Sequence, residues 1–234
     1  MTVLFWDIDG TLLTTGRAGV PAWEQAVLEV TGRAFELSSI RIAGLTDFQI
    51  AVRTLEELGL PHDDGQVLGM VRRYEALLPS ALPQRQGSVL PSVREILEHL
   101  RGLVEVRSYL LTGNTRGGAR AKLTHYDLVS YFPDGAFAED AGGRGTIARR
   151  ALDLARRDGP VDPDGVFVIG DTPHDVHCAD AIGARTIAVA TGGYSVTELE
   201  AHNPWKVLEQ LPPPADFMRL LAEGRPASAS AGGR

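Results

Sequence analysis

The chain has 234 residues, of which 44% are hydrophobic and 23% charged, a composition typical of a globular protein with a sizeable core. Its formal net charge of −7 argues against a sequence-independent nucleic-acid-binding protein, which needs a basic face. The single cysteine, Cys178, excludes an intrachain disulfide bond. The sequence shows neither a secretory signal nor an apolar run of transmembrane length, so we expect a cytoplasmic protein without a membrane partner.

The N-terminal part of the sequence predicts one strand followed by helices. Residues 2–6 (TVLFW) form a continuous apolar run, which indicates a short buried strand. The next stretch has apolar residues at helical spacing and no convincing strand, and it predicts helices over 21–31, 46–59 and 65–78. The segment 79–91 (PSALPQRQGSVLP) is rich in proline and reads as a connector.

After residue 91 the predicted elements alternate. Strands are predicted over 104–111, 136–138, 166–169 and 186–190, and helices over 92–101, 115–126, 146–157 and 175–182. Such alternation indicates a parallel sheet that is covered by helices on both faces. We therefore predict an α/β fold with a doubly wound, Rossmann-like parallel sheet and an α-helical cap inserted after the first strand. The expected boundaries are 1–13 and 89–212 for the core, 14–88 for the cap, and 213–234 for a partly disordered C-terminal tail, which ends in ASASAGGR.

Acidic residues follow two of the predicted strands and a TGN segment follows a third. Asp7 and Asp9 lie in DIDGT, Asp171 and Asp175 lie in GDTPHD, and TGN spans 112–114. Because the carboxyl ends of parallel strands meet at one edge of a sheet, these groups should converge there. Each motif alone is common in turns and helix caps, but their joint occurrence at three strand ends indicates a site. Four converging carboxylates need a cation, and hard oxygen ligands favour Mg²⁺.

This set of motifs resembles the haloacid dehalogenase superfamily, in particular its phosphatases similar to phosphoglycolate phosphatase. The resemblance covers nearly the whole chain, from residue 3 to about residue 211, and it includes the helical cap. It implies Mg²⁺-dependent hydrolysis of a small phosphorylated metabolite, for example phosphoglycolate or a sugar phosphate, through an aspartyl-phosphate. The motifs specify the superfamily but not the substrate, and either a monomer or a homodimer fits the sequence.

The resemblance also implies roles for individual residues. Asp7 would be the nucleophile, and Asp9 would be the general acid and then the general base. The implied metal ligands are Asp7, Asp9, Asp171 and Asp175, and the implied phosphate-binding residues are Thr112, Gly113 and Asn114. In the cap, the stretch RIAGLTD would face the site and help to select the substrate through Arg41, Thr46 and Asp47. Thr46 or Asp47 suits the N-cap of a helix equally well.

One element of the family pattern is missing. The superfamily places a lysine before the helix that precedes the last acidic strand, where it neutralises the nucleophile and the phosphate. Here that place holds Arg144, while Lys122 lies about two turns into the helix after TGN. Lys122 and Lys206 are the two lysines in the chain. Either Lys122 or Arg144 could act as the catalytic cation, or be a surface charge.

The same motifs also occur in proteins with activities other than that of a phosphatase, and the sequence excludes some of these. A dehalogenase would not need Asp9, and a phosphonatase that forms a Schiff base needs a cap lysine, which residues 14–100 lack. A phosphomutase of the β-phosphoglucomutase type keeps the same acidic set and stays open. A phosphoacceptor signalling domain also clusters aspartates on a doubly wound sheet, but such domains are shorter and have no inserted cap. A silent scaffold would not be expected to keep every acidic position.

Overall fold

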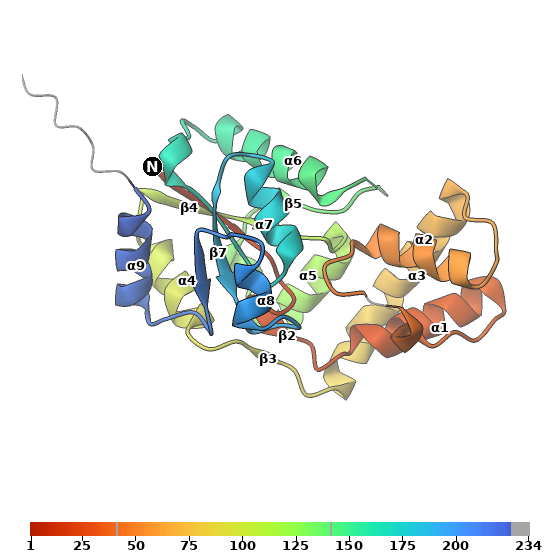
Figure 1. Ribbon diagram of the computed structural model, residues 1–234. Coiled ribbons are helices and arrows are strands. Elements are labelled where there is room, and N and C mark those ends of the chain that lie inside the picture. Colours follow the sequence, from red (N-terminus) through yellow and green to blue (C-terminus); the bar gives the residue numbers. More distant parts are fainter. Residues whose placement is uncertain (41, 141, 226–234) are drawn as a thin grey trace, which may run out of the picture.

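The computed structural model describes residues 1–40, 42–140 and 142–225, which form an α/β core with a helical cap beside it (Figure 1). The core holds a six-stranded sheet in the order β5-β4-β1-β6-β7-β8, with every neighbouring pair parallel. The strands are β1 (Thr2–Trp6), β4 (Val106–Leu111), β5 (Gly135–Ala136), β6 (Val166–Gly170), β7 (Arg185–Val189) and β8 (Lys206–Leu208). The predicted fold class is therefore confirmed.

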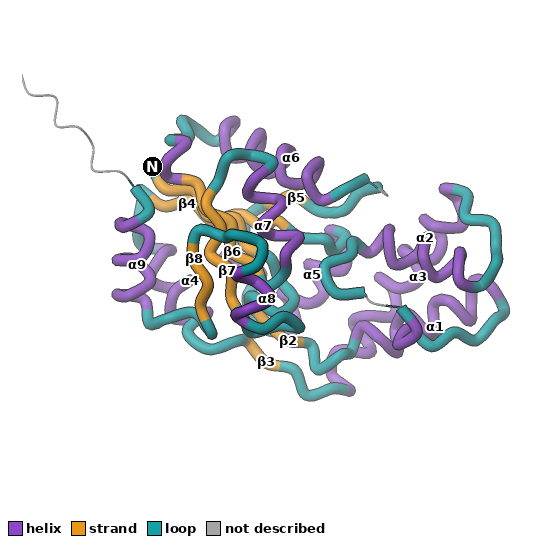
Figure 2. Tube along the Cα trace, viewed as in Figure 1, coloured by secondary structure: helices purple, strands orange, loops and turns teal. Residues whose placement is uncertain are grey.

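Helices cover both faces of this sheet (Figure 2). One face carries α6 (Arg144–Arg157) and α7 (Pro173–Asp180), and the other carries α4 (Val93–Arg101), α5 (Arg116–His125) and α9 (Pro214–Glu223). Because side chains alternate along a strand, Val3 and Phe5 pack on the first face while Leu4 and Trp6 pack on the second. Strand β1 is fully buried between these layers, as its continuous apolar sequence predicts.

The cap lies between β1 and α4 in the chain. Its helices are α1 (Gly19–Thr31), α2 (Asp47–Glu57) and α3 (Asp64–Ala81). Trp23 of α1 stacks on Tyr74 of α3, with ring centroids 4.3 Å apart, so aromatic packing holds these two helices together. Two short antiparallel strands, β2 (Leu13–Thr14) and β3 (Ser88–Val89), join the cap to the core. This pair lies close to the cap boundaries of 14 and 88 that we propose.

Several element boundaries differ from the prediction. Helix α3 runs through Pro79 to Ala81, although we placed 79–91 in a connector. The side chains of Leu78 and Leu82 are fully buried in the core cluster, so packing keeps the last turn helical. The prediction also missed β2, β3, β8 and the short helix α8 (Val196–Glu200). Short 3₁₀ helices lie at Leu37–Ser39, Leu82–Gln84, Val129–Tyr131 and Pro163–Gly165.

Part of the segment predicted as a C-terminal tail is structured. Helix α9 begins at Pro214, and its Phe217 is fully buried with its ring centroid 5.7 Å from that of Trp6. The final residues, 226–234, lie outside the described residues, and they include the ASASAGGR segment. In the described ranges, no helix combines the length and the apolar character needed to cross a membrane.

Candidate active site

The carboxyl ends of β1, β4, β6 and β7 surround a cavity beneath the cap. Its volume is about 580 Å³, within the usual size range of ligand pockets. The core contributes Asp7, Asp9, Lys122, Arg144 and Asp171 to its wall, and residues from α1, α2, α3 and the loop before α2 line the opposite side. The sheet edge thus brings together groups that are far apart in the sequence, as the motifs predicted.

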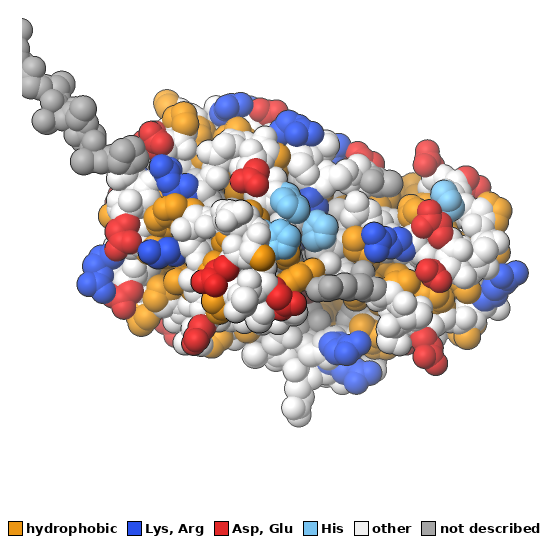
Figure 3. Space-filling model, in the orientation of Figure 1, with side chains coloured by type: hydrophobic (Ala, Val, Ile, Leu, Met, Phe, Trp, Pro, Cys, Tyr) orange, Lys and Arg blue, Asp and Glu red, His pale blue; other side chains and the backbone are white. Residues whose placement is uncertain are grey.

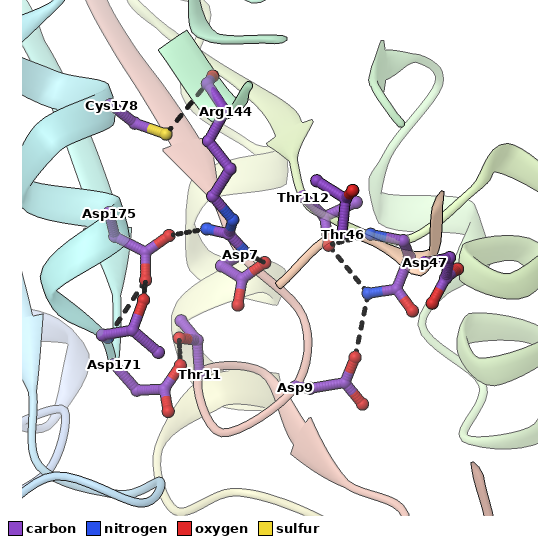
Figure 4. Close-up of polar contacts among 12 residues, drawn as sticks. Asp7, Asp9, Thr11, Thr46, Asp47, Thr112, Arg144, Asp171, Asp175 and Cys178 are labelled. Carbon is purple, nitrogen blue, oxygen red and sulfur yellow. Dashed lines mark hydrogen bonds and ion pairs between the residues drawn. The ribbon is translucent and has the colours of Figure 1, made fainter. Parts of the chain in front are cut away.

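Three carboxylates form a tight buried cluster at this edge. Asp7 follows β1, Asp171 follows β6, and Asp175 lies in the first turn of α7. One carboxylate oxygen from each lies within 4.8 Å of the others, and all three side chains are buried (Figure 4). Burial and the neighbouring carboxylate of Asp175 raise the pKa of Asp7 to about 7, and burial together with Asp7 raises the pKa of Asp171 well above its ordinary range.

The chemistry of this cluster fits a divalent metal ion. It offers several hard oxygen donors in a place shielded from water, where their mutual repulsion favours a bound cation. Among the described residues, Oδ1 of Asp7 is buried and has no hydrogen-bond partner. Such an unsatisfied buried oxygen is available as a ligand. Asp9 does not belong to the cluster, and its predicted role as a metal ligand stays a prediction.

Two glycines make room for the Asp171 side chain. A Cβ atom on Gly10 would lie 2.4 Å from Oδ2 of Asp171, and one on Gly192 would lie 1.7 Å from the same atom. Gly10 also has a φ of 82°, which favours glycine. Thr191 donates a hydrogen bond of 2.5 Å to the carbonyl oxygen of Gly10, so the loop after β7 closes around the acidic cluster. This loop was not among the predicted site residues, although its sequence, 191–193 (TGG), directly follows a predicted strand.

Arg144 is the cation that faces Asp7. It is the first residue of α6, its side chain is buried, and Nη1 donates to Oδ1 of Asp175 at 2.6 Å. Its Nη2 lies 3.7 Å from Oδ1 of Asp7, and Figure 4 shows the guanidinium pointing toward both carboxylates. Burial alone would lower the pKa of Arg144, but Asp175 and Asp7 outweigh it and raise that pKa. Beneath it lies the buried thiol of Cys178, with Sγ 3.6 Å from the carbonyl oxygen of Arg144.

Lys122 is buried as well, but it contacts Asp9 and not Asp7. Its Nζ lies 2.6 Å from Oδ2 of Asp9 and 2.6 Å from Oδ1 of Asn114. Nδ2 of Asn114 donates to the same Oδ2 of Asp9 at 2.9 Å and to Oγ1 of Thr112 at 2.8 Å. Burial lowers the pKa of Lys122 while Asp9 raises it, and the net shift is upward. Neither candidate cation is therefore a surface charge, and the two occupy different parts of the site.

Of the three predicted phosphate-binding residues, Gly113 and Asn114 line the cavity and Thr112 contacts Asn114. The side chain of Asn114 is already engaged by Asp9, Thr112 and Lys122. The hydroxyl oxygen of Thr112 accepts from Asn114, and a hydrogen bond from Thr112 is the smallest of the influences that act on the pKa of Asp7, which it lowers. Contacts between these three residues and a phosphate stay a prediction.

The cap loop contacts the core directly. Thr46 is the N-cap of α2: its Oγ1 accepts from the backbone N–H of Gln49, whose Oε1 accepts from the N–H of Thr46. The backbone N–H of Asp47 donates to the carbonyl oxygen of Gly113 at 2.9 Å, and Oδ2 of Asp47 accepts from the N–H of Thr115 at 2.8 Å. The predicted N-cap is thus present at Thr46, and Asp47 both lines the cavity and binds the core. Arg41 lies outside the described residues.

A second cap contact is made at Gly44. A Cβ atom there would lie 2.1 Å from Cδ2 of His174, so the cap loop packs tightly on the start of α7. His174 belongs to a row of histidine rings with His177 and His202, which gather on one face of the molecule (Figure 3). Together with Asp47, this contact holds the cap closed over the cavity.

Comparisons with known proteins agree with this site. A family model described as HAD-hydrolase-like matches residues 144–213, the segment that carries Arg144, Asp171 and Asp175. The chain is 28% identical over 211 residues to the protein named "Probable phosphatase IndB" from Dickeya dadantii (strain 3937), covering 88% of this chain and 89% of that protein.

Two solved structures share the fold over nearly the whole chain. A hydrolase from Pseudomonas syringae has a TM-score of 0.72 at 22% identity, covering 97% of this chain and 100% of that one. A predicted phosphoglycolate phosphatase from Haemophilus somnus 129PT has a TM-score of 0.70 at 15% identity, covering 94% and 97%. With the motifs in this order and this geometry, the chain is similar to hydrolases of the haloacid dehalogenase superfamily, and it has a helical cap inserted after its first strand.

Proposed function

We propose that this protein is a Mg²⁺-dependent phosphatase that hydrolyses a small phosphomonoester through an aspartyl-phosphate on Asp7. The observation that carries the proposal is the buried cluster of Asp7, Asp171 and Asp175 with the guanidinium of Arg144 beside it. The match of residues 144–213 to the HAD-hydrolase-like family model and the relative named as a probable phosphatase support it.

The acidic cluster would hold the metal ion. In the part of the chain that the structure describes, oxygens of Asp7, Asp171 and Asp175 lie close enough together to share one ion. The fourth ligand that we expect is the backbone carbonyl of Asp9. When bound, Mg²⁺ supplies the positive charge that lets a carboxylate and a phosphoryl group approach each other. Arg144 adds a second positive charge on the side of Asp7 that faces α6.

Asp7 acts first, as the nucleophile. An oxygen of its carboxylate attacks phosphorus, and the bond between phosphorus and the oxygen of the alcohol breaks. Asp9 in its protonated form gives its proton to that departing oxygen. The cavity then holds an aspartyl-phosphate, and the free alcohol leaves.

Water completes the reaction. Asp9, now a carboxylate, takes a proton from the water as its oxygen attacks phosphorus, and the bond between phosphorus and Asp7 breaks. Inorganic phosphate leaves, Asp7 is a carboxylate again, and Asp9 is protonated for the next turnover. Among the described residues, Lys122 and Asn114 both donate to Oδ2 of Asp9. We therefore expect Oδ1 of Asp9 to be the oxygen that gives and takes the proton.

The test is release of inorganic phosphate from p-nitrophenyl phosphate by purified protein with and without Mg²⁺. We expect many turnovers per molecule that stop on chelation, and loss of turnover in Asp7→Asn, which has nearly the same shape. Wild-type rates in Asp7→Asn would overturn the proposal. A single stoichiometric phosphorylation would indicate a phosphoacceptor domain instead, and transfer of the phosphoryl group to a second hydroxyl without phosphate release would indicate a phosphomutase.

A further inference from the structure

The cap side of the cavity is mainly apolar. Its wall is formed by the side chains of Val20, Trp23, Ile42, Leu45, Ile50 and Tyr74, which come from α1, α2, α3 and the loop before α2. The phosphoryl-transfer groups lie on the opposite, core side. A substrate that places its phosphate at Asp7 would therefore direct its alcohol part toward apolar surface.

The charges around the cavity do not provide for a second anion in the described residues. Lys122 is engaged by Asp9, and Arg144 is engaged by Asp175 and Asp7, so both serve the phosphoryl end. Among the described residues of the wall, the remaining cation is Arg17, whose side chain is exposed to solvent.

The cap wall instead contributes a carboxyl group, that of Asp47. Burial raises its pKa to about 6, which leaves it mostly ionised at neutral pH. The buried cation that acts on Asp47 is Lys122, which is already bound to Asp9. A carboxylate on the alcohol part of a substrate would meet Asp47 and compete with two carboxylates for this one cation, and like charges in such a place are costly.

The size of the cavity also favours a large apolar alcohol part. Its volume of about 580 Å³ exceeds what a two-carbon alcohol such as glycolate fills, and it lies in the range that holds ligands with a ring system.

We propose that the preferred substrate is a phosphomonoester whose alcohol carries a neutral apolar or aromatic group, and that esters with a second anionic group, such as phosphoglycolate, are poor substrates. This inference rests on the phosphatase activity proposed above. It assigns the choice of substrate to the six apolar cap residues and Asp47.

A matched pair of esters tests the inference. Benzyl phosphate and 4-carboxybenzyl phosphate differ by one remote carboxylate and have nearly the same leaving oxygen. We expect kcat/KM to be higher for benzyl phosphate by about tenfold or more, because the added charge faces Asp47 and apolar side chains. Equal values, or a preference for the carboxylated ester, would overturn the inference while leaving the phosphatase activity intact.

A second experiment adds a positive charge to the cap wall. Val20→Arg introduces a cation at a half-buried position in the first turn of α1, and Val20→Met is the matched control that keeps the wall apolar. Val20→Arg should reduce or reverse the preference, whereas Val20→Met should keep it. Ile42→Arg, in the loop before α2, is the second variant if Val20→Arg unfolds.

The outcomes separate the two proposals. If both arginine variants fold and leave the ratio of kcat/KM values unchanged, the cap wall does not contact the alcohol and the inference is wrong. If the wild type turns over neither ester nor p-nitrophenyl phosphate in the presence of Mg²⁺, the proposed function itself fails, and the inference fails with it.

Discussion

The ammonium group of Lys122 lies 2.6 Å from Oδ2 of Asp9, although 113 positions separate the two residues in the chain. Asn114 reaches both of them, so the orientation of the Asp9 carboxylate is fixed by two donors on the same oxygen. We therefore propose that Lys122 positions Asp9 for proton transfer, whereas Arg144 lies beside Asp7. The site thus holds two buried cations, one on Asp9 and one on Asp7 and Asp175, where the resemblance leads us to expect a single lysine.

Replacing Lys122 should impair catalysis more than substrate binding. We expect Lys122→Met to lower kcat for p-nitrophenyl phosphate by about 10²-fold with little change in KM, because a loosely held Asp9 transfers protons poorly. Lys122→Arg should recover part of the rate. The control is Lys206→Met, which removes the same charge from an exposed position near Trp205. A large rise in KM with unchanged kcat in Lys122→Met would show that Lys122 binds substrate instead.

Arg144 should contribute to stability as well as to activity. Its removal leaves two buried carboxylates, Asp175 and Asp7, without their cation, and breaking such a buried pair typically costs about 3–5 kcal/mol. We expect Arg144→Ala to lose about that much free energy of unfolding in urea at pH 8 without metal. Arg150→Ala breaks exposed ion pairs on the same helix and should cost about 0–1 kcal/mol. Similar losses in the two variants would contradict the assignment of Arg144.

The glycine beside Asp171 offers a conservative test of the metal site. A methyl group at Gly192 would collide with Oδ2 of Asp171, whereas one at Gly193 would meet no atom of the described residues within 4 Å. We expect Gly192→Ala to weaken Mg²⁺ binding by about 10- to 100-fold, as the loss of supporting contacts commonly does. Gly193→Ala should bind Mg²⁺ like the wild type. A titration of the melting temperature against Mg²⁺ measures both, and equal affinities would rule out this arrangement.

Asp47 should make stability depend on pH. Its pKa is raised from 3.8 to about 6 in the folded protein, first of all by burial, so the folded state binds more protons than the unfolded state between these values. Stability therefore falls as pH rises from about 4 to about 6. Relative to Asp47→Asn, the wild type should lose up to about 3 kcal/mol of unfolding free energy across this window.

The comparison is made in EDTA by urea unfolding at several pH values. Asp7 and Asp171 also have raised pKa values, but they are present in both proteins, and their contributions cancel in the difference. A difference between wild type and Asp47→Asn that does not vary with pH would show that Asp47 is ionised in both folded and unfolded states.

The sequence predicted those parts of the site that follow from strand ends. DIDGT and GDTPHD each follow a buried apolar strand, and the rule that parallel strands end at one edge was enough to bring Asp7, Asp171 and Asp175 together. The same rule could have found Gly192, because it follows β7, but a pair of glycines carries no chemistry that marks it as part of a metal site.

What the sequence could not supply were contacts that depend on side-chain direction across the fold. Lys122 and Arg144 were left as alternatives because spacing does not say which carboxylate each one meets. Asp47 was predicted to select the substrate, and its hydrogen bonds to Gly113 and Thr115 exist because the closed cap brings α2 against the core. Two of the missed elements, β8 and α9, are held by long-range contacts: β8 pairs with β7, and Phe217 of α9 packs against Trp6.

The position of β1 has a consequence for how the protein folds. This strand is made first, yet it lies in the middle of the sheet, paired with β4 from residue 106 onward and with β6 from residue 166 onward. One of its faces packs against α4, α5 and α9, and Phe217 near the end of the described chain contacts Trp6. During synthesis, β1 therefore stays unpaired and exposes its apolar side chains until β4 and β6 have been made. Contacts of such long range slow folding, and we expect refolding of this protein to be slow and prone to aggregation while β1 is exposed.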